Sequence, residues 1–312
     1  MELNTITGTD LKVSAAGLGC NNFGKACDER QSRETIHAAM DAGINFFDTA
    51  DIYGGRGRSE EILGRVLSGI DRDSIIIATK FGNRMSDDGS LQGASCEYIR
   101  SAVEASLKRL NIEYIDLYQQ HVPDPETPIE ESLRALDDLV SQGKVRFIGN
   151  SNFSGWQIAD ADWSARNNKL CRFVTAQNEY SLLERGIERE LVPACQRFDL
   201  DILPYFPLAR GLLTGKYQRD ASPPAGTRLA SHNEKRLKRI MSEEAFDRID
   251  ALTTFAGDTG HSLLELAMSW LISQPNVPSV IAGATSVDQV RQNAAAVAWK
   301  LTPGELEAVD AL

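Results

Sequence analysis

The sequence predicts an α/β fold, a (β/α)8 TIM barrel with an N-terminal β-hairpin and extra helices. Two observations support this prediction. First, eight short apolar segments alternate strictly with amphipathic ones, and no linker interrupts them, so we expect a single barrel domain over residues 1–312. Second, no segment has the strand–GxGxxG–helix pattern, which weakens the rival doubly wound nucleotide-binding fold.

The predicted strands are short apolar runs. The chain begins with a hairpin, in which a Gly-Thr-Asp turn joins residues 1–6 to residues 11–14. Runs of about four to eight apolar residues between turn signals are typical of buried parallel strands. Eight such runs are expected to form the barrel, at 15–19, 44–49, 74–80, 114–121, 145–151, 173–180, 201–206 and 278–284.

Amphipathic segments between these strands are predicted to be helices. Gly43 stops the first of them, and Ser59 and Thr302 are expected N-caps, with Pro303 in the first turn of the last helix. The stretch 207–242 is rich in Gly, Pro, Ser and basic residues, and a loop of that length is usually functional or disordered. The helices are expected at 30–43, 59–67, 96–111, 129–143, 154–167, 186–198, 243–256, 262–273, 286–299 and 302–312.

Composition excludes several classes of protein. With 42% hydrophobic and 25% charged residues the chain is ordinary for a globular protein, and its net charge of −11 argues against a nucleic-acid partner. Five cysteines, an odd number without a CxxC pair, fit a reducing compartment. The N-terminus lacks a secretory signal pattern and no apolar run approaches the ~18 residues of a membrane span, so we expect a cytoplasmic protein without a membrane partner. The oligomeric state stays open.

Four reactive residues stand at the ends of three successive predicted strands. Asp48 and Tyr53 follow the second strand, Lys80 ends the third and His121 ends the fourth. Strand ends of a barrel meet on one face, so we expect these side chains to share a pocket. Singly, each residue has an ordinary structural explanation, such as a cap, a core phenol or a surface charge. Their joint placement favours an active site.

The chemistry of this set suits proton transfer to a carbonyl oxygen. A phenol with a pKa of about 10 is a poor proton donor at neutral pH. The ammonium group of Lys80 should lower that pKa, and Asp48 should keep Lys80 charged and oriented. We expect His121 to polarise the carbonyl oxygen, and Lys80 to matter for tuning the phenol rather than for folding.

These residues lie in segments that closely resemble the aldo-keto reductase superfamily over essentially the whole chain. DAGINFFDTADIYG resembles its signature around the catalytic aspartate and tyrosine, TKFG its lysine motif, and YIDLYQQH its histidine strand. The resemblance is nearer to bacterial members related to potassium-channel β subunits than to vertebrate hydroxysteroid enzymes. It implies NAD(P)H-dependent reduction of aldehydes or ketones, including sugar-derived ones, to alcohols. Tyr53 is then the general acid, Asp48 and Lys80 tune it, and His121 orients the small-molecule carbonyl substrate.

The resemblance also implies a cofactor site for NADP(H), with NAD as the alternative. Serine is frequent in the family where Phe206 stands, and an apolar residue where Asn150 stands, so local cofactor geometry can differ here. Lys216 and Arg228 supply positive charge from the long loop. The residues implied near the nicotinamide are Gly19, Cys20, Asn21, Asp48, Ser151, Asn152, Gln177 and the stacking Tyr205; near the pyrophosphate Phe206, Pro207, Leu208, Ala209 and Arg210; and near the adenosine phosphate Gly283, Thr285, Gln289, Gln292 and Asn293.

The walls of the substrate pocket are expected to include Phe23, Ile52, Gly82 and Val122, which flank the catalytic candidates in sequence. No metal site is expected. Two other functions remain open. One is a regulatory or sensor subunit that binds NADP and turns over slowly, like the channel β subunits of the superfamily. The other is a lyase or isomerase that uses Lys80 as a Schiff base. The natural substrate, the physiological direction of the reaction and the strictness of the NADP preference stay open.

Overall fold

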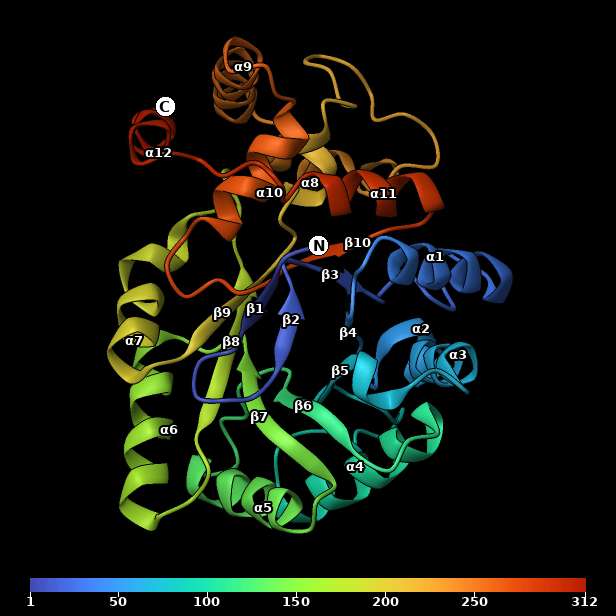
Figure 1. The fold of residues 1–312 in the computed structure, drawn as a ribbon. Coiled ribbons are helices and arrows are strands. Elements are labelled where there is room, and N and C mark those ends of the chain that lie inside the picture. The colour runs from blue at the N-terminus through green and yellow to red at the C-terminus, as the bar shows by residue number, and fades with distance from the viewer.

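The computed structural model describes residues 1–312 and contains the predicted barrel (Figure 1). Eight parallel strands are hydrogen-bonded in the order β10-β3-β4-β5-β6-β7-β8-β9. The backbone N–H of Ile202 on β9 donates to the carbonyl of Asn276, just before β10, at 2.6 Å, so the sheet nearly closes on itself. The barrel strands are β3 Ala16–Gly19, β4 Phe46–Asp48, β5 Ile76–Phe81, β6 Ile115–Gln120, β7 Val145–Ser151, β8 Phe173–Glu179, β9 Asp201–Tyr205 and β10 Val280–Gly283.

Helices surround the sheet and cover its outer face (Figure 1). No helix is long and apolar enough to cross a membrane. The α-helices are α1 Glu29–Asp41, α2 Tyr53–Arg56, α3 Arg58–Leu67, α4 Cys96–Leu110, α5 Ile129–Ser141, α6 Gly155–Asn168, α7 Leu191–Phe198, α8 Glu234–Ile240, α9 Glu243–Asp258, α10 Leu263–Ile272, α11 Val287–Ala295 and α12 Pro303–Asp310. Short 3-10 helices lie at η1 Arg72–Ser74, η2 Gly186–Arg189, η3 Ala209–Thr214 and η4 Leu229–Ser231. Helices α1, α3, α4, α5, α6 and α10 each bury five or more residues, because both faces of a parallel sheet must be covered, whereas α2 and α8 bury none.

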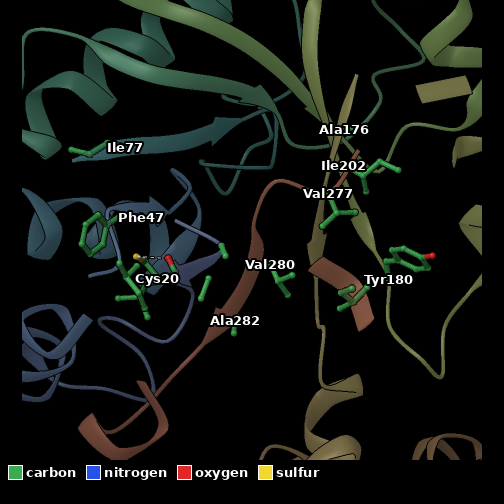
Figure 2. Close-up of a cluster of buried hydrophobic side chains, with 14 of the residues drawn as sticks. Cys20, Phe47, Ile77, Ala176, Tyr180, Ile202, Val277, Val280 and Ala282 are labelled. Carbon is green, nitrogen blue, oxygen red and sulfur yellow. Dashed lines mark hydrogen bonds between the residues drawn. The ribbon is translucent and has the colours of Figure 1, made fainter. Parts of the chain in front are cut away.

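The main hydrophobic core lies between the sheet and the helices. Figure 2 draws part of this core, with Phe47 beside Cys20, Ile77 on the neighbouring strand β5, and Val280 and Ala282 along β10. These side chains are all less than a tenth exposed. This continuous packing fixes the strands relative to one another, and therefore fixes the side chains at their ends.

A second, smaller core fills the N-terminal end of the barrel. The predicted hairpin pairs β1 Leu3–Thr5 with β2 Lys12–Ser14, and its apolar residues pack against inward-facing strand residues. Because side chains alternate along a strand, the residue two positions after each inward one also points inward. The members of this core are Ile6, Leu11, Val13, Phe46, Ile76, Ala78, Leu117, Leu203 and Ile281.

Three predicted elements differ from the structure. Ser59 is not the N-cap of α3; Gly57, with φ of 105°, occupies that position, and the Ser59 hydroxyl is buried and bonds to Thr49 and to the Cys20 carbonyl. The predicted helix 186–198 is divided into η2 and α7. The stretch 207–242 is not a plain loop, since it contains η3, η4 and α8. Thr302 does cap α12, as predicted, through a capping box.

Candidate active site

The strand ends place three polar side chains directly above the inner core. Phe46, Ala78 and Leu117 belong to that core. Asp48, Lys80 and Gln119 follow them by two residues on β4, β5 and β6 and therefore point the same way. Strand register keeps the set together, because Lys80 lies opposite Gln119 and Asp48 lies opposite Ala78. The inward-facing side chains therefore change from apolar to polar over two residues along each of these strands.

Lys80 is the centre of this polar group and has no exposed side-chain surface. Its Nζ donates to Asp48 Oδ2 at 2.6 Å and to the Thr49 carbonyl at 2.9 Å. The third contact of Nζ is the Tyr53 hydroxyl, at 3.5 Å. All three protons of the ammonium group therefore have an oxygen to face.

Asp48 receives hydrogen bonds on both carboxylate oxygens. While Oδ2 faces Lys80, Oδ1 accepts from Gln119 Nε2 at 3.2 Å and from Gln177 Nε2 at 2.9 Å. A carboxylate can be buried without a large penalty only when its lone pairs are satisfied in this way. Asp48 is therefore held in one orientation by residues from three other strands.

Tyr53 and His121 stand next to each other at the edge of this cluster. Their rings make an edge-to-face contact with centroids 5.7 Å apart. Backbone bonds tie the segment before Tyr53 to β5, since Thr49 N donates to the Ala78 carbonyl and Asp51 N donates to the Lys80 carbonyl. His121 N donates to the Phe81 carbonyl at 2.8 Å. The structure thus brings the four predicted residues together.

Burial shifts the pKa values of these groups. Burial raises the pKa of Tyr53 above its ordinary value; Lys80 opposes that rise and Asp48 adds to it. Burial lowers the pKa of Lys80, but Asp48 and Tyr53 outweigh it and hold that pKa above normal. Burial and the charge of Lys80 lower the pKa of His121 to about 3. Lys80 is therefore charged and His121 neutral at physiological pH.

One expectation about the phenol needs correction. The influence of Lys80 on the Tyr53 pKa is downward, as predicted, but desolvation is larger and the net shift is upward. Sequence spacing shows which charges are near a group, and it does not show how much water the fold removes. The ammonium group limits the rise in this pKa rather than producing a net fall.

The residues implied near a nicotinamide form a hydrogen-bonded chain beside the cluster. The Tyr205 hydroxyl donates to Asn152 Oδ1 at 2.8 Å, and Asn152 Nδ2 donates to the His121 carbonyl at 2.9 Å and to Ser151 Oγ at 3.0 Å. Ser151 Oγ in turn donates to the Gln177 carbonyl at 2.9 Å. Asn152 has a φ of 62°, a left-handed conformation that asparagine tolerates. These hydrogen bonds link the ends of β7, β8 and β9 to the catalytic candidate His121.

The end of β3 lies beside the start of the segment 283–293, which the resemblance places near the adenosine phosphate, because β3 pairs with β10. Gly19 lies opposite Gly283, and a Cβ on Gly283 would come within 3.1 Å of Asn21 Oδ1. Thr285 donates through its N–H to Gln289 Oε1 at 2.8 Å. Two other residues of this region, Cys20 and Asn293, are buried, and Gln292 is exposed. Arg291 is also exposed, and it was not among the residues predicted from the sequence.

The predicted basic loop is only partly free to bind an anion. Arg210 forms a two-point ion pair with Glu179, at 2.5 and 3.0 Å. Arg228 forms no ion pair, and burial followed by Arg210 lowers its pKa. Lys216 is exposed and its Nζ lies 5.3 Å from the Tyr217 ring centroid. Of the remaining predicted residues, Phe206, Pro207 and Leu208 form the turn between β9 and η3, and Ala209 begins η3.

The predicted pocket walls are only partly at the surface. Phe23 is completely buried and belongs to the main hydrophobic core. Ile52 lies next to Tyr53, and its backbone is helical. Gly82 has a φ of 113°, and a Cβ there would meet Gly93, His121 and Val122 only at ordinary contact distances. Gly82 is buried beside His121, and its positive φ, rather than a lack of space, is what favours glycine at this position.

A buried polar network beneath the site was not predicted. Asp51 is 1% exposed, and its carboxyl accepts one long hydrogen bond from the Tyr98 hydroxyl, at 3.4 Å, while Oδ1 has no partner. Glu60, also buried, accepts from Thr79 at 2.5 Å and from Arg109 Nε at 2.6 Å. Arg109 thus pairs with Glu60, while Asp51 has no ion-pair partner and is influenced by Arg109 only at longer range. Burial first, and then Glu60, raises the pKa of Asp51 to about 7.

Asp51→Asn is expected to remove a pH dependence of stability. The folded state keeps a proton on Asp51 up to about pH 7, whereas the unfolded chain loses it near the ordinary value of 3.8. The folded state therefore binds more protons in this window, and the free energy of unfolding falls as pH rises through it. At about 1.4 kcal/mol per pKa unit, the loss between pH 5 and pH 8 is about 3 kcal/mol. Urea unfolding at pH 5 and pH 8 checks this. If the free energy of unfolding of the variant fell with pH as steeply as that of the wild type, this prediction would be contradicted.

Comparisons with known proteins agree with this geometry. The family model described as "Aldo/keto reductase family" matches residues 15–312. The chain is 37% identical to "Uncharacterized oxidoreductase YrpG" of Bacillus subtilis, over 95% of the chain and 91% of that protein. It is 35% identical to a "Probable voltage-gated potassium channel subunit beta" of Oryza sativa, over 100% and 96% of the two chains.

A third similar protein carries the name of a specific reductase. The chain is 32% identical to the "Versiconal hemiacetal acetate reductase" of Aspergillus parasiticus, over 98% of the chain and 95% of that protein. These matches extend over nearly the full length of both chains, so they concern the whole barrel and not one motif. The chain therefore belongs to the aldo/keto reductase family, a family of oxidoreductases that reduce carbonyl groups with a nicotinamide cofactor.

Proposed function

We propose that this chain is an NADPH-dependent reductase of aldehydes or ketones, in which Tyr53 donates the proton. The observation that carries the proposal is the position of Lys80 Nζ, 2.6 Å from Asp48 Oδ2 and 3.5 Å from the Tyr53 hydroxyl. A buried ammonium group between a carboxylate and a phenol stabilises the phenolate that proton donation leaves behind.

In this mechanism Tyr53 gives its proton to the developing alkoxide oxygen. The negative charge that then forms on the phenolate oxygen faces Lys80, whose own charge is held by Asp48. Gln119 and Gln177 keep Asp48 oriented, so little rearrangement accompanies the transfer. When bound, the reduced nicotinamide supplies the hydride to the carbonyl carbon.

His121 orients the substrate in this proposal. Its pKa of about 3 leaves the ring neutral, and Nδ1 is buried without a hydrogen-bond partner. A neutral imidazole has one donor and one acceptor nitrogen, so it can bind a carbonyl oxygen without competing with Tyr53 as the acid. Its edge-to-face contact with the Tyr53 ring keeps the two groups beside one oxygen.

The residues at the cofactor end fit a phosphorylated dinucleotide. Arg228 is half-buried and has no carboxylate partner, although the protein carries a net charge of −11. An unpaired guanidinium group in such a position favours an anion, and its planar donors match a phosphate. Ser151, Asn152 and Gln177 supply amide and hydroxyl groups for a carboxamide, and Tyr205 supplies a ring for stacking. The proposal treats residues 1–312 as one catalytic domain, because the hairpin closes the barrel.

Arg228→Ala is expected to weaken the binding of NADPH much more than the binding of NADH. A charge-assisted hydrogen bond contributes ~1.5–3 kcal/mol, so the dissociation constant of NADPH should rise by roughly one to two decades. NADH has no 2′-phosphate and should lose little. Quenching of tryptophan fluorescence during titration gives both constants. Arg291→Ala is the matched control, because Arg291 is an exposed arginine in the other segment assigned to the adenosine phosphate.

Two outcomes would contradict this assignment of Arg228. Equal losses for the two cofactors would mean that the guanidinium group supports the loop or the pyrophosphate instead. A larger loss in Arg291→Ala than in Arg228→Ala would move the phosphate contact to α11.

The similarity to a rice protein named as a probable channel subunit favours one other function, a subunit that binds cofactor and turns over slowly. Steady-state oxidation of NADPH with a generic aldehyde separates the two, because a slow binder consumes almost none. A Schiff-base lyase is disfavoured on chemical grounds. Such a lysine must be an unprotonated nucleophile, whereas Asp48 holds the pKa of Lys80 above its ordinary value.

A further inference from the structure

Phe206 stands between the two arginines of the turn that follows β9. Its ring centroid is 4.7 Å from the Cζ of Arg210 and 4.8 Å from the Cζ of Arg228. The ring also makes an edge-to-face contact with Tyr205, with centroids 5.3 Å apart. An aromatic face attracts a cation through its quadrupole, so one ring here serves two guanidinium groups.

The two arginines differ in how their charge is balanced. Glu179 pairs with Arg210 through both carboxylate oxygens, which neutralises that side of the stack. Arg228 has no such partner, and both burial and the nearby Arg210 work against its charge. The Phe206 ring lies against the Arg228 guanidinium and helps to stabilise its charge when no anion is present, together with the nearby Tyr217 and Tyr53.

The backbone of this turn explains how the ring reaches both arginines. Phe206, Ala209 and Arg210 have φ values of 52°, 45° and 58°, all in the left-handed region that side chains rarely adopt. Ala209 N donates to the Phe206 carbonyl at 2.8 Å and closes the turn. Such a conformation persists only where surrounding contacts hold it, and here the Glu179 ion pair and the stack do so.

We propose that Phe206 is a specificity-determining residue, whose ring holds the Arg228 guanidinium ready for the 2′-phosphate of the cofactor. Glu179 completes the arrangement because it prevents Arg210 from competing for the same phosphate. This inference rests on the proposed function. It adds that the preference for the phosphorylated cofactor comes from a preorganised stack, and not from Arg228 alone. A flexible arginine would lose conformational entropy when it binds the phosphate. Because the stack already restricts the Arg228 side chain, that entropy cost of binding is smaller.

Replacement of the ring tests the stack. Phe206→Leu keeps an apolar side chain and removes the quadrupole, so the dissociation constant of NADPH should rise about three- to tenfold. The constant for NADH should change less than about twofold, because NADH has no group for Arg228 to bind. Phe206→Tyr keeps an aromatic ring and should retain the NADPH preference. Adenosine 2′,5′-bisphosphate, which has no nicotinamide ring, should show the same loss as NADPH in the leucine variant.

A double-mutant cycle separates the stack from general effects on the turn. In an Arg228→Ala background, Phe206→Leu should cause no further loss of NADPH affinity, because the ring then has no guanidinium group to position for the phosphate. Thermal unfolding of each variant shows whether the turn still folds. The aromatic variant keeps the test decisive if the leucine variant is unstable.

Each outcome has a definite meaning. Equal losses of affinity for NADPH and NADH in Phe206→Leu, or additive losses of NADPH affinity in the double-mutant cycle, would overturn the inference and leave the reductase proposal in place. An unchanged NADPH constant in Phe206→Leu would do the same. If the wild-type protein binds neither cofactor, both the inference and the proposed function fail.

Discussion

Tyr53→Phe is expected to lower turnover of an aldehyde by about 10²–10⁴-fold, the usual effect of losing one well-placed general acid. The substitution removes only the hydroxyl, which lies 3.5 Å from Lys80 Nζ. The ring can keep its edge-to-face contact with His121, and Lys80 keeps its shorter bond to Asp48. Cofactor affinity should therefore stay nearly unchanged. Initial rates and cofactor titrations measure the two quantities.

Tyr118→Phe is a matched control for this variant. Tyr118 is completely buried, whereas Tyr53 is partly exposed, and the Tyr118 hydroxyl has no hydrogen-bond partner and does not contact Lys80. Removal of that hydroxyl should leave turnover within about threefold of wild type, as for a residue outside the reacting groups. Near-normal turnover in Tyr53→Phe would exclude Tyr53 as the proton donor.

Lys80→Met is expected to abolish turnover and also to destabilise the protein. Lys80 has no exposed side-chain surface and that of Asp48 is 3% exposed, so the substitution leaves a buried carboxylate without its cation. Removing one partner of a buried ion pair costs ~3–5 kcal/mol. We expected from the sequence that Lys80 matters for the phenol rather than for folding, and the complete burial of the pair revises that expectation. Urea unfolding and initial rates measure the two effects.

The double variant Asp48→Asn with Lys80→Met separates the two roles of the lysine. It removes both charges, so it should recover much of the lost stability, while turnover stays at background. A single Lys80→Met variant as stable as wild type would show that the pair contributes nothing to folding. Measurable turnover in either variant would show that the ammonium group is not needed to tune Tyr53.

The barrel was predictable because its pattern is repeated along the chain. Eight apolar runs and the helices between them were all found within a few residues of their predicted places. The exceptions are local. Ser59 looked like an N-cap by residue type, but its hydroxyl bonds to the Cys20 carbonyl inside the fold, a contact between residues 39 positions apart. Such a contact depends on how α3 packs against the barrel, which the local sequence does not show.

The site was predictable where strand ends carry reactive residues, and less so elsewhere. Asp48, Lys80 and His121 each lie within one residue of a strand end, so the topology brings them together. Gln119 was overlooked, although its place two residues before His121 was a usable signal for an inward side chain. The pKa of Asp51 and the two arginines around Phe206 depend on burial and on a left-handed turn. Neither can be derived from spacing along the chain.

The most direct test of this account follows reduced nicotinamide and alcohol together in one reaction. Wild-type protein, NADPH labelled with deuterium on the transferring carbon and a simple aldehyde should consume cofactor continuously and yield alcohol with one deuterium on the carbonyl carbon. The Tyr53→Phe variant should bind NADPH and produce almost none. Tight binding of NADPH by the wild-type protein without formation of deuterated alcohol from any aldehyde or ketone would contradict the account, and would favour a binding subunit instead.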